Sequence, residues 1–224
     1  MKKLYIIHGW TYTVEPWTRT LKLLKDAGIK TEMLHVPGLT EESKKVWTVE
    51  DYAKWANQNI PDGAIALGHS NGGRILLNLL SKKPNKLKHL ILLDAAGVHE
   101  KSTKKSLVQK VSKIGKPLKN NKFIRKVYHK LVGATDYEKA PDNMKKTLTN
   151  MLESDKNLKI EDVTTPTTIL WGEQDRVTPI HQAEIMQKRL PNSNLKTYKN
   201  WTHAPYLSHP DELARAIVST MEKI

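Results

Sequence analysis

Six short apolar or β-branched runs are separated by longer stretches with helical periodicity, and this alternation strongly constrains the fold. The runs are Leu4–Ile7, Glu32–Val36, Ala64–Leu67, Leu90–Leu93, Thr168–Trp171 and Leu195–Tyr198. After the first run, Trp17, Leu21, Leu24 and Ala27 recur at intervals of three and four, as on one helix face. Strands that alternate with helices are joined by right-handed crossovers, which make the strands parallel and cover both faces of the sheet. We therefore expect an α/β fold with a mainly parallel sheet of about six strands.

The alternation breaks between Gly97 and about Pro166. The chain has 224 residues, which at about 150 per domain suggests one domain, alone or with an insertion. Two apolar helical faces lie in the break: Leu107, Val111, Ile114 and Leu118, then Ile124, Val127, Tyr128 and Leu131. We expect a core of residues 1–97 and 166–224, with a small helical cap inserted at 98–165.

Positive charge is concentrated in one segment. The chain has 37 basic and 23 acidic residues, a net charge of +14. Residues 101–130 hold ten lysines and Arg125 with no acidic residue, which leaves 26 basic against 23 acidic residues elsewhere. A solvated helix face accounts for such a segment, and its confinement to the expected cap argues against a nucleic-acid binder.

Several classes of protein are excluded or disfavoured. No cysteine is present, which excludes disulfide scaffolds, thiol nucleophiles and thiolate metal sites. The apolar run near the N-terminus is shorter than the core of a signal peptide, which needs about 7–15 residues. No apolar run reaches the length of about 18 residues that a membrane span needs. We expect a soluble, cytoplasmic protein.

The segment Gly68–Gly73, GHSNGG, carries the strongest chemical signal. It directly follows the expected strand at Ala64–Leu67 and opens the helical run Arg74–Leu77. G-x-S-x-G between a strand and a helix is a nucleophile elbow, where bulk two residues either side of the serine would collide with the turn. The turn points the helix N-terminus at the reacting carbonyl. We predict that Ser70 is a nucleophile.

A serine nucleophile needs a base, and the base needs an orienting acid. His203 lies in the loop just after the last expected strand, and Asp175 lies in the loop after the strand before it. Both loops reach the same sheet edge, so we predict His203 as the base and Asp175 as its acid. Asp94, after the strand Leu90–Leu93, stays a rival for the acid.

The first strand ends in His8-Gly9-Trp10, where the chain passes close to the expected serine. We predict that the backbone N–H groups of Trp10 and Asn71 form an oxyanion hole. We also expect the indole of Trp10 to wall the acyl pocket.

These motifs resemble the α/β-hydrolase superfamily, and in particular its serine esterase-like members with a helical cap. The resemblance spans nearly the whole chain: the His-Gly pair, GHSNGG, LILLDAAG, WGEQDRVTP and the terminal histidine loop. It implies the triad Ser70, Asp175 and His203 in that chain order, and a start at the family's third strand. Trp201-Thr202 and His209 depart from the family pattern and bear on the shape of the substrate.

The resemblance implies a carboxylesterase that cleaves small-to-medium esters through an acyl-enzyme. Because the nucleophile is a serine, relatives that use an aspartate are disfavoured. No cofactor is implied, and we expect no metal because His203 and His209 lack a third ligand at suitable spacing. The alternative is hydrolysis of a C–C bond in a β-diketone-like substrate. Relatives of that kind commonly carry Trp after the histidine, where this chain has Ala204.

A second alternative adds binding to catalysis. The basic cap could make weak, salt-dependent contacts with an anionic membrane or nucleic acid. Aromatic residues for base stacking are sparse there, with only Phe123 and Tyr128. The cap could also draw in anionic esters, so the expected partner is a small ester with no obligate nucleic acid.

Overall fold

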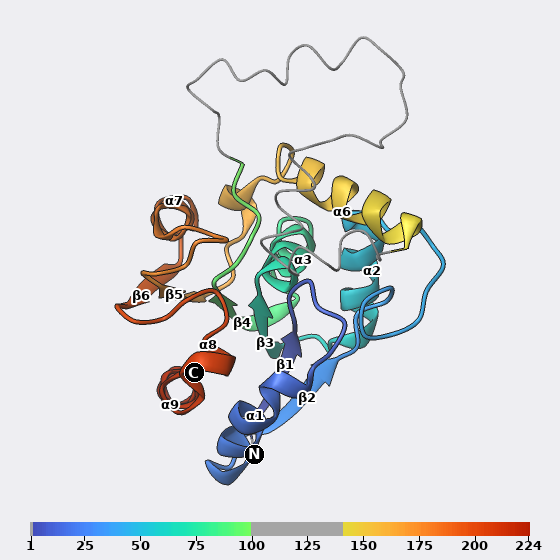
Figure 1. Cartoon of the computed structure of the whole chain (residues 1–224). Coiled ribbons are helices and arrows are strands. Elements are labelled where there is room, and N and C mark those ends of the chain that lie inside the picture. The colour runs from blue at the N-terminus through green and yellow to red at the C-terminus, as the bar shows by residue number, and fades with distance from the viewer. Residues whose placement is uncertain (1, 100–140) are drawn as a thin grey trace.

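The computed structural model describes residues 2–99 and 141–224, which build one parallel six-stranded sheet (Figure 1). Its strands are β1 Lys3–Ile7, β2 Lys30–Leu34, β3 Ala64–His69, β4 Leu87–Leu93, β5 Thr167–Gly172 and β6 Ser193–Tyr198. Their order across the sheet is β2-β1-β3-β4-β5-β6, with every pair parallel. The predicted α/β fold with six strands is confirmed.

The second strand is shifted from its prediction. It was expected at Glu32–Val36 and lies at Lys30–Leu34. Among the described strands it pairs only with β1, whose last paired residue, Ile7, faces Leu34. Beyond that point the carbonyl of Val36 accepts hydrogen bonds from the backbone N–H groups of the next turn, so Val36 is buried without being in the strand.

Helices cover both faces of the sheet. They are α1 Thr18–Asp26, α2 Val49–Asn59, α3 Asn71–Leu80, α6 Asp142–Ser154, α7 Ile180–Arg189, α8 Pro205–Ser208 and α9 Pro210–Glu222, with short 3-10 turns η1 Glu15–Trp17 and η3 Ile160–Asp162. In Figure 1, α1 and α9 lie together on one side, and α2, α3 and α6 lie on the other. Side chains of a strand alternate between the two faces of the sheet and pack into a separate hydrophobic core on each face. In β1, Leu4 and Ile6 pack towards α1 and α9, whereas Tyr5 and Ile7 pack towards α2 and α3.

Part of the range predicted as a cap packs on the core. The predicted helices through Leu107 and Ile124 lie outside the described residues. Helix α6 is described, and its Met144, Leu148 and Met151 are buried in the same cluster as Tyr52 of α2. We propose that α6 belongs to the core, and the separate cap stays a prediction for residues that the structure does not describe.

The carboxyl ends of the parallel strands gather the residues singled out by sequence. Ser70 follows β3, Asp94 follows β4, Asp175 follows β5 and His203 follows β6 in the next loop. This edge is where open α/β sheets place their ligands. None of the helices in the described ranges is long and apolar enough to cross a membrane.

Candidate active site

Ser70 lies in a sharp turn between β3 and α3. Its backbone has φ 51° and ψ −116°, a conformation that non-glycine residues rarely adopt and that concentrates at functional sites. A Cβ at Gly68 would lie 2.6 Å from the backbone nitrogen of Gly73, and one at Gly72 would collide with the carbonyl of Ile7. The glycines thus make room for the turn, as the sequence predicts. The backbone N–H of Ser70 also donates to the carbonyl of Leu93 at 3.1 Å, which ties the turn to β4.

His203 reaches Ser70 from the loop between β6 and α8. Its Nε2 lies 3.0 Å from Ser70 Oγ, and its Nδ1 lies 2.7 Å from Asp175 Oδ2. A carboxylate can only accept, so Nδ1 carries the proton and Nε2 presents its lone pair to the serine. The three side chains predicted as the triad therefore form one hydrogen-bonded chain.

The backbone of the histidine loop is held by a second imidazole. His69 Nε2 donates to the carbonyl of His203 at 2.8 Å, and the His69 ring is fully buried. Burial, assisted by the nearby His203, lowers the pKa of His69 to about 3, so its ring is neutral at neutral pH. His69 directly precedes Ser70 in the sequence, but the sequence does not reveal this bond, which joins residues 134 positions apart.

Asp175 is held by four donors. Its Oδ1 accepts the backbone N–H groups of Val177 at 2.6 Å and Thr178 at 3.0 Å. Its Oδ2 accepts the Thr178 hydroxyl at 2.6 Å and His203 Nδ1 at 2.7 Å. Burial alone would raise the pKa of Asp175, but these hydrogen bonds, above all the one from His203, outweigh it and keep the pKa below its ordinary value. The side chain is therefore an ionised acceptor for the imidazole.

The rival acid Asp94 occupies a different place. It follows β4 with φ 43°, is fully buried, and its Oδ1 accepts the backbone N–H of Gly172 at 2.8 Å. Among the described hydrogen bonds, His203 Nδ1 contacts Asp175 and the hydroxyl of Thr178, not Asp94. Of the two acids, the geometry favours Asp175 as the partner of His203.

The loop after β1 brings the predicted oxyanion residues beside the serine. Gly9 packs so closely that a Cβ there would lie 3.0 Å from Ser70 Cβ, and Trp10 lines the same cavity. Asn71 is the first residue of α3, where a backbone N–H has no partner within the helix. Both predicted donor residues thus flank Ser70.

The His8 side chain has a role that the sequence does not reveal. Its Nδ1 donates to the Gly9 carbonyl and its Nε2 accepts the hydroxyl of Thr40, each at 2.8 Å. Burial lowers the pKa of His8 to about 4, which keeps the ring neutral. The Gly9 carbonyl and the Trp10 N–H belong to one planar peptide, so this bond fixes the direction of that N–H. Thr40 is 32 residues away, and no local motif links the two.

A cavity of about 610 Å³ opens beside Ser70 and His203. Its lining is partly apolar, from Trp10, Val177, Tyr206 and Leu207, and partly polar, from Thr11, Gln174, Arg176 and Thr202. Trp10 thus lines this cavity, and its role in an acyl pocket stays a prediction. Trp201, one of the departures from the family pattern, is fully buried and donates to Glu212 Oε2 at 2.6 Å, outside this lining.

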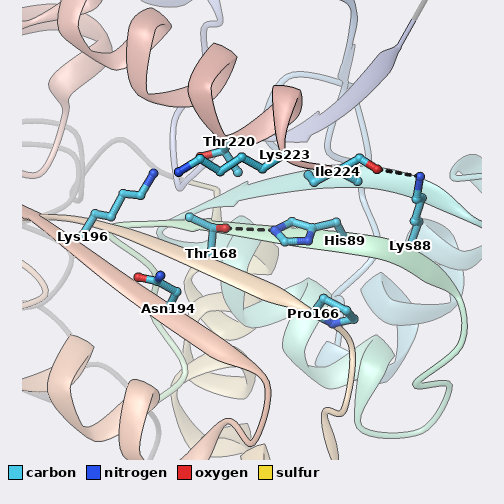
Figure 2. Close-up of a pocket in the computed structure, with 9 residues that line it drawn as sticks. All are labelled: Lys88, His89, Pro166, Thr168, Asn194, Lys196, Thr220, Lys223 and Ile224. Carbon is cyan, nitrogen blue, oxygen red and sulfur yellow. Dashed lines mark hydrogen bonds between the residues drawn. The ribbon is translucent and has the colours of Figure 1, made fainter.

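A second hollow of about 380 Å³ lies at the amino ends of β4, β5 and β6 (Figure 2). Ser70 lies at the opposite edge of the sheet, where the carboxyl ends of the strands lie. His89 bonds Thr168 at 2.9 Å there, and Lys88 donates to the carbonyl of Ile224 at 2.9 Å. None of the residues that line it belongs to the hydrogen-bonded triad, so we assign the candidate active site to the larger cavity.

Comparison with known proteins agrees with this arrangement. A model of the alpha/beta hydrolase fold family matches residues 3–158 and 121–210. The pimeloyl-(acyl-carrier protein) methyl ester esterase of Aromatoleum aromaticum is 22% identical over 94% of this chain and 94% of its own. The esterase of the same name from Legionella pneumophila (strain Paris) is 25% identical over 93% of this chain and 90% of its own.

Among solved structures, an alpha/beta hydrolase enzyme from a sediment metagenome of the Mar Chica lagoon, Morocco, superposes with a TM-score of 0.72 at 20% identity. That match covers 99% of this chain and 91% of the other. The family match extends over most of the described core. The chain therefore belongs to the alpha/beta hydrolase fold family, as an esterase-like member.

Proposed function

We propose that this protein is a serine carboxylesterase that hydrolyses small-to-medium esters through an acyl-enzyme. One observation carries the proposal: the chain Ser70 Oγ to His203 to Asp175, with distances of 3.0 and 2.7 Å, lies on the wall of an open cavity. A serine that is hydrogen-bonded to an oriented neutral imidazole is an activated nucleophile.

In acylation, His203 Nε2 takes the proton of Ser70 as Oγ attacks the ester carbonyl. The tetrahedral intermediate collapses when His203 gives that proton to the leaving alcohol, and the acyl group stays on Ser70. In deacylation, His203 takes a proton from water, the resulting attack releases the acid, and Ser70 recovers its proton. Asp175 stays ionised throughout and stabilises the imidazolium.

The backbone N–H groups of Trp10 and Asn71 are the donors that would hold the oxyanion. Each such donor typically contributes on the order of 100- to 1000-fold in rate. The N-terminus of α3 adds a favourable partial positive charge at the same point.

The substrate class is narrowed by the relatives and by the cavity. The two relatives are named for the methyl ester of a pimeloyl chain on an acyl-carrier protein, which supports methyl esters of acyl chains as a test class. The partly apolar lining beside Ser70 suits a short or medium acyl chain. We propose a small ester as the substrate.

The test is hydrolysis of p-nitrophenyl esters with acyl chains of two to twelve carbons, together with acyl methyl esters. Ser70→Ala should fold normally and lose turnover. Ser208→Ala is the matched control, because Ser208 is an exposed serine on α8 near the cavity but outside its lining. Turnover near the wild-type rate in Ser70→Ala would refute the proposal.

The same assay separates the alternatives. A folded protein that hydrolyses no ester but cleaves a vinylogous diketone, followed by its spectrum, would be a C–C hydrolase instead. Preference for anionic esters that weakens with added salt would support attraction by the basic segment 101–130. Turnover ratios that do not change with salt would count against that attraction.

A further inference from the structure

Two buried carboxyl groups meet behind the imidazole. Asp175, 5% exposed, comes from the loop after β5, and Asp94, fully buried, comes from the end of β4. Gly172 links the two residues: its N–H donates to Asp94 Oδ1 at 2.8 Å, and its carbonyl accepts the backbone N–H of Asp175 at 3.2 Å. Two ionised carboxylates this close to each other in a buried place would repel strongly, so one of them has to carry a proton.

The donors around each group decide where that proton resides. Asp175 accepts hydrogen bonds from Val177, from both groups of Thr178 and from His203. Asp94 accepts one, from the N–H of Gly172, and its Oδ2 finds no N–H or O–H donor in the described residues. A negative charge is far better supported on Asp175, so the proton belongs to Asp94.

We propose that Asp94 is a neutral carboxylic acid at neutral pH, that its Oδ2–H donates to the Asp175 carboxylate, and that it thereby acts as a positioning residue for His203. This inference rests on the proposed function of Ser70, His203 and Asp175. The result is a continuous chain from Asp94 through Asp175 and His203 to Ser70. One further link steadies it: the Thr178 hydroxyl, 2.6 Å from Asp175 Oδ2, also lies 3.1 Å from the backbone carbonyl of Asp94.

The other titratable groups near Asp94 agree with a neutral side chain. Burial first, and then the charge of Asp175, raises the pKa of Asp94 well above its ordinary value. Tyr206 of α8 is also neutral, because burial raises its pKa to about 12. The other titratable groups near this site in the described elements are Asp175, His203, Tyr206 and His69, and His69 is neutral because burial lowers its pKa to about 3. Arg74 of α3, the buried cation closest in sequence to the elbow, is bound by Asp155 and Asn71 instead.

Replacement of Asp94 by Asn or by Ala separates a neutral acid from an ionised one. Asn keeps an oxygen for the Gly172 N–H and an N–H₂ for Asp175, and it tolerates the positive φ at this position. Ala keeps neither polar group. If Asp94 is neutral, Asp94→Asn should keep most of the esterase activity that Asp94→Ala loses.

The measurement is kcat and KM for a p-nitrophenyl ester across pH. We expect kcat/KM of Asp94→Asn within about threefold of wild type, with the acid limb of the profile unmoved. Asp94→Ala should lose about tenfold or more, mainly in kcat, because His203 is less well positioned. Its acid limb should move to higher pH, since Asp175 with one donor fewer holds the imidazolium proton more tightly.

If Asp94 is ionised, the acid limb of the pH profile should move in the opposite direction. Both replacements would then remove a negative charge near the imidazole and move the acid limb to lower pH, which would overturn the inference. Equal losses in Asp94→Asn and Asp94→Ala would overturn it as well. Loss of turnover in Ser70→Ala tests the proposed function separately, so the two failures are distinguishable.

Infrared spectroscopy tests the protonation state without any activity. At pH 7, the difference spectrum between wild type and Asp94→Asn should show loss of a protonated carboxylic acid band. Asp62→Asn is the control: Asp62 is exposed and pairs with Lys86, so its difference spectrum should show loss of an ionised carboxylate band. A carboxylate band lost in Asp94→Asn would refute the neutral acid, even if Asp94→Ala does not fold.

Discussion

Replacing Asp155 by alanine should destabilise the protein severely, because Asp155 neutralises a buried arginine of the helix that begins at the elbow. Arg74 Nε and Nη2 donate to the two oxygens of Asp155 at 2.7 and 2.8 Å. The two residues are only 4% and 8% exposed. The pair joins α3 to the end of α6, so it also holds α6 against the rest of the described fold.

The magnitude follows from what Arg74 keeps after the change. In Asp155→Ala the guanidinium retains one acceptor among the described residues, the side-chain oxygen of Asn71 at 2.7 Å. Breaking a buried pair in this way typically costs about 3–5 kcal/mol. A whole domain is stabilised by about 5–15 kcal/mol, so the loss is a large fraction of the total.

The assay is urea unfolding followed by circular dichroism, with linear extrapolation to water. Glu153→Ala is the matched control, because Glu153 forms an exposed pair with Lys156 at 3.9 Å and should change stability by less than about 1 kcal/mol. The double replacement Arg74→Met with Asp155→Leu removes both charges and should recover most of the stability. Asp155→Ala within about 1 kcal/mol of wild type would refute this reasoning.

Two further changes test the geometry around the elbow and its neighbouring loop. Gly72→Ala places a methyl group against the carbonyl of Ile7, so it should cost at least about 2 kcal/mol and lower Tm by about 4 °C or more; an unchanged Tm would contradict the packing. His8→Gln should weaken the fall in stability at acid pH. The folded pKa of His8, about 4, lies below the ordinary histidine value of 6.5, so from pH 6.5 down to 4 the unfolded chain binds more protons and the unfolding free energy drops by roughly 3 kcal/mol. Urea midpoints measured across this pH range should show a shallower slope in His8→Gln, and identical slopes would contradict the assignment.

The sequence alone predicts the parts of the site that depend on strand order along the chain. Ser70, Asp175 and His203 each follow an apolar run that reads as a strand, and the carboxyl ends of parallel strands share one edge. The role of the glycines in the elbow can also be predicted from the sequence, because a tight strand-to-helix turn excludes side chains on both sides of the serine.

The contacts that support the triad cannot be predicted from the sequence in this way, because they depend on which strands become neighbours in the sheet. Asp94 comes close to Asp175 because β4 lies beside β5, and His8 meets Thr40, which lies 32 residues further along the chain, after α1 and β2. The shift of β2 has the same origin, since its length is set by pairing with β1 rather than by its own apolar residues. Helix α6 has an ordinary amphipathic pattern, and only its burial against α2 supports our proposal that it belongs to the core.

Covalent capture of the acyl group tests the central claim, that Ser70 is the nucleophile, most directly. The protein would be mixed with p-nitrophenyl acetate, quenched in acid within milliseconds, digested and analysed by mass spectrometry. We predict an acetyl group on the peptide that contains Ser70, near one per protein molecule, and none in Ser70→Ala. An acetyl group on another residue that turns over with the substrate, or ester hydrolysis that persists in Ser70→Ala, would contradict the account.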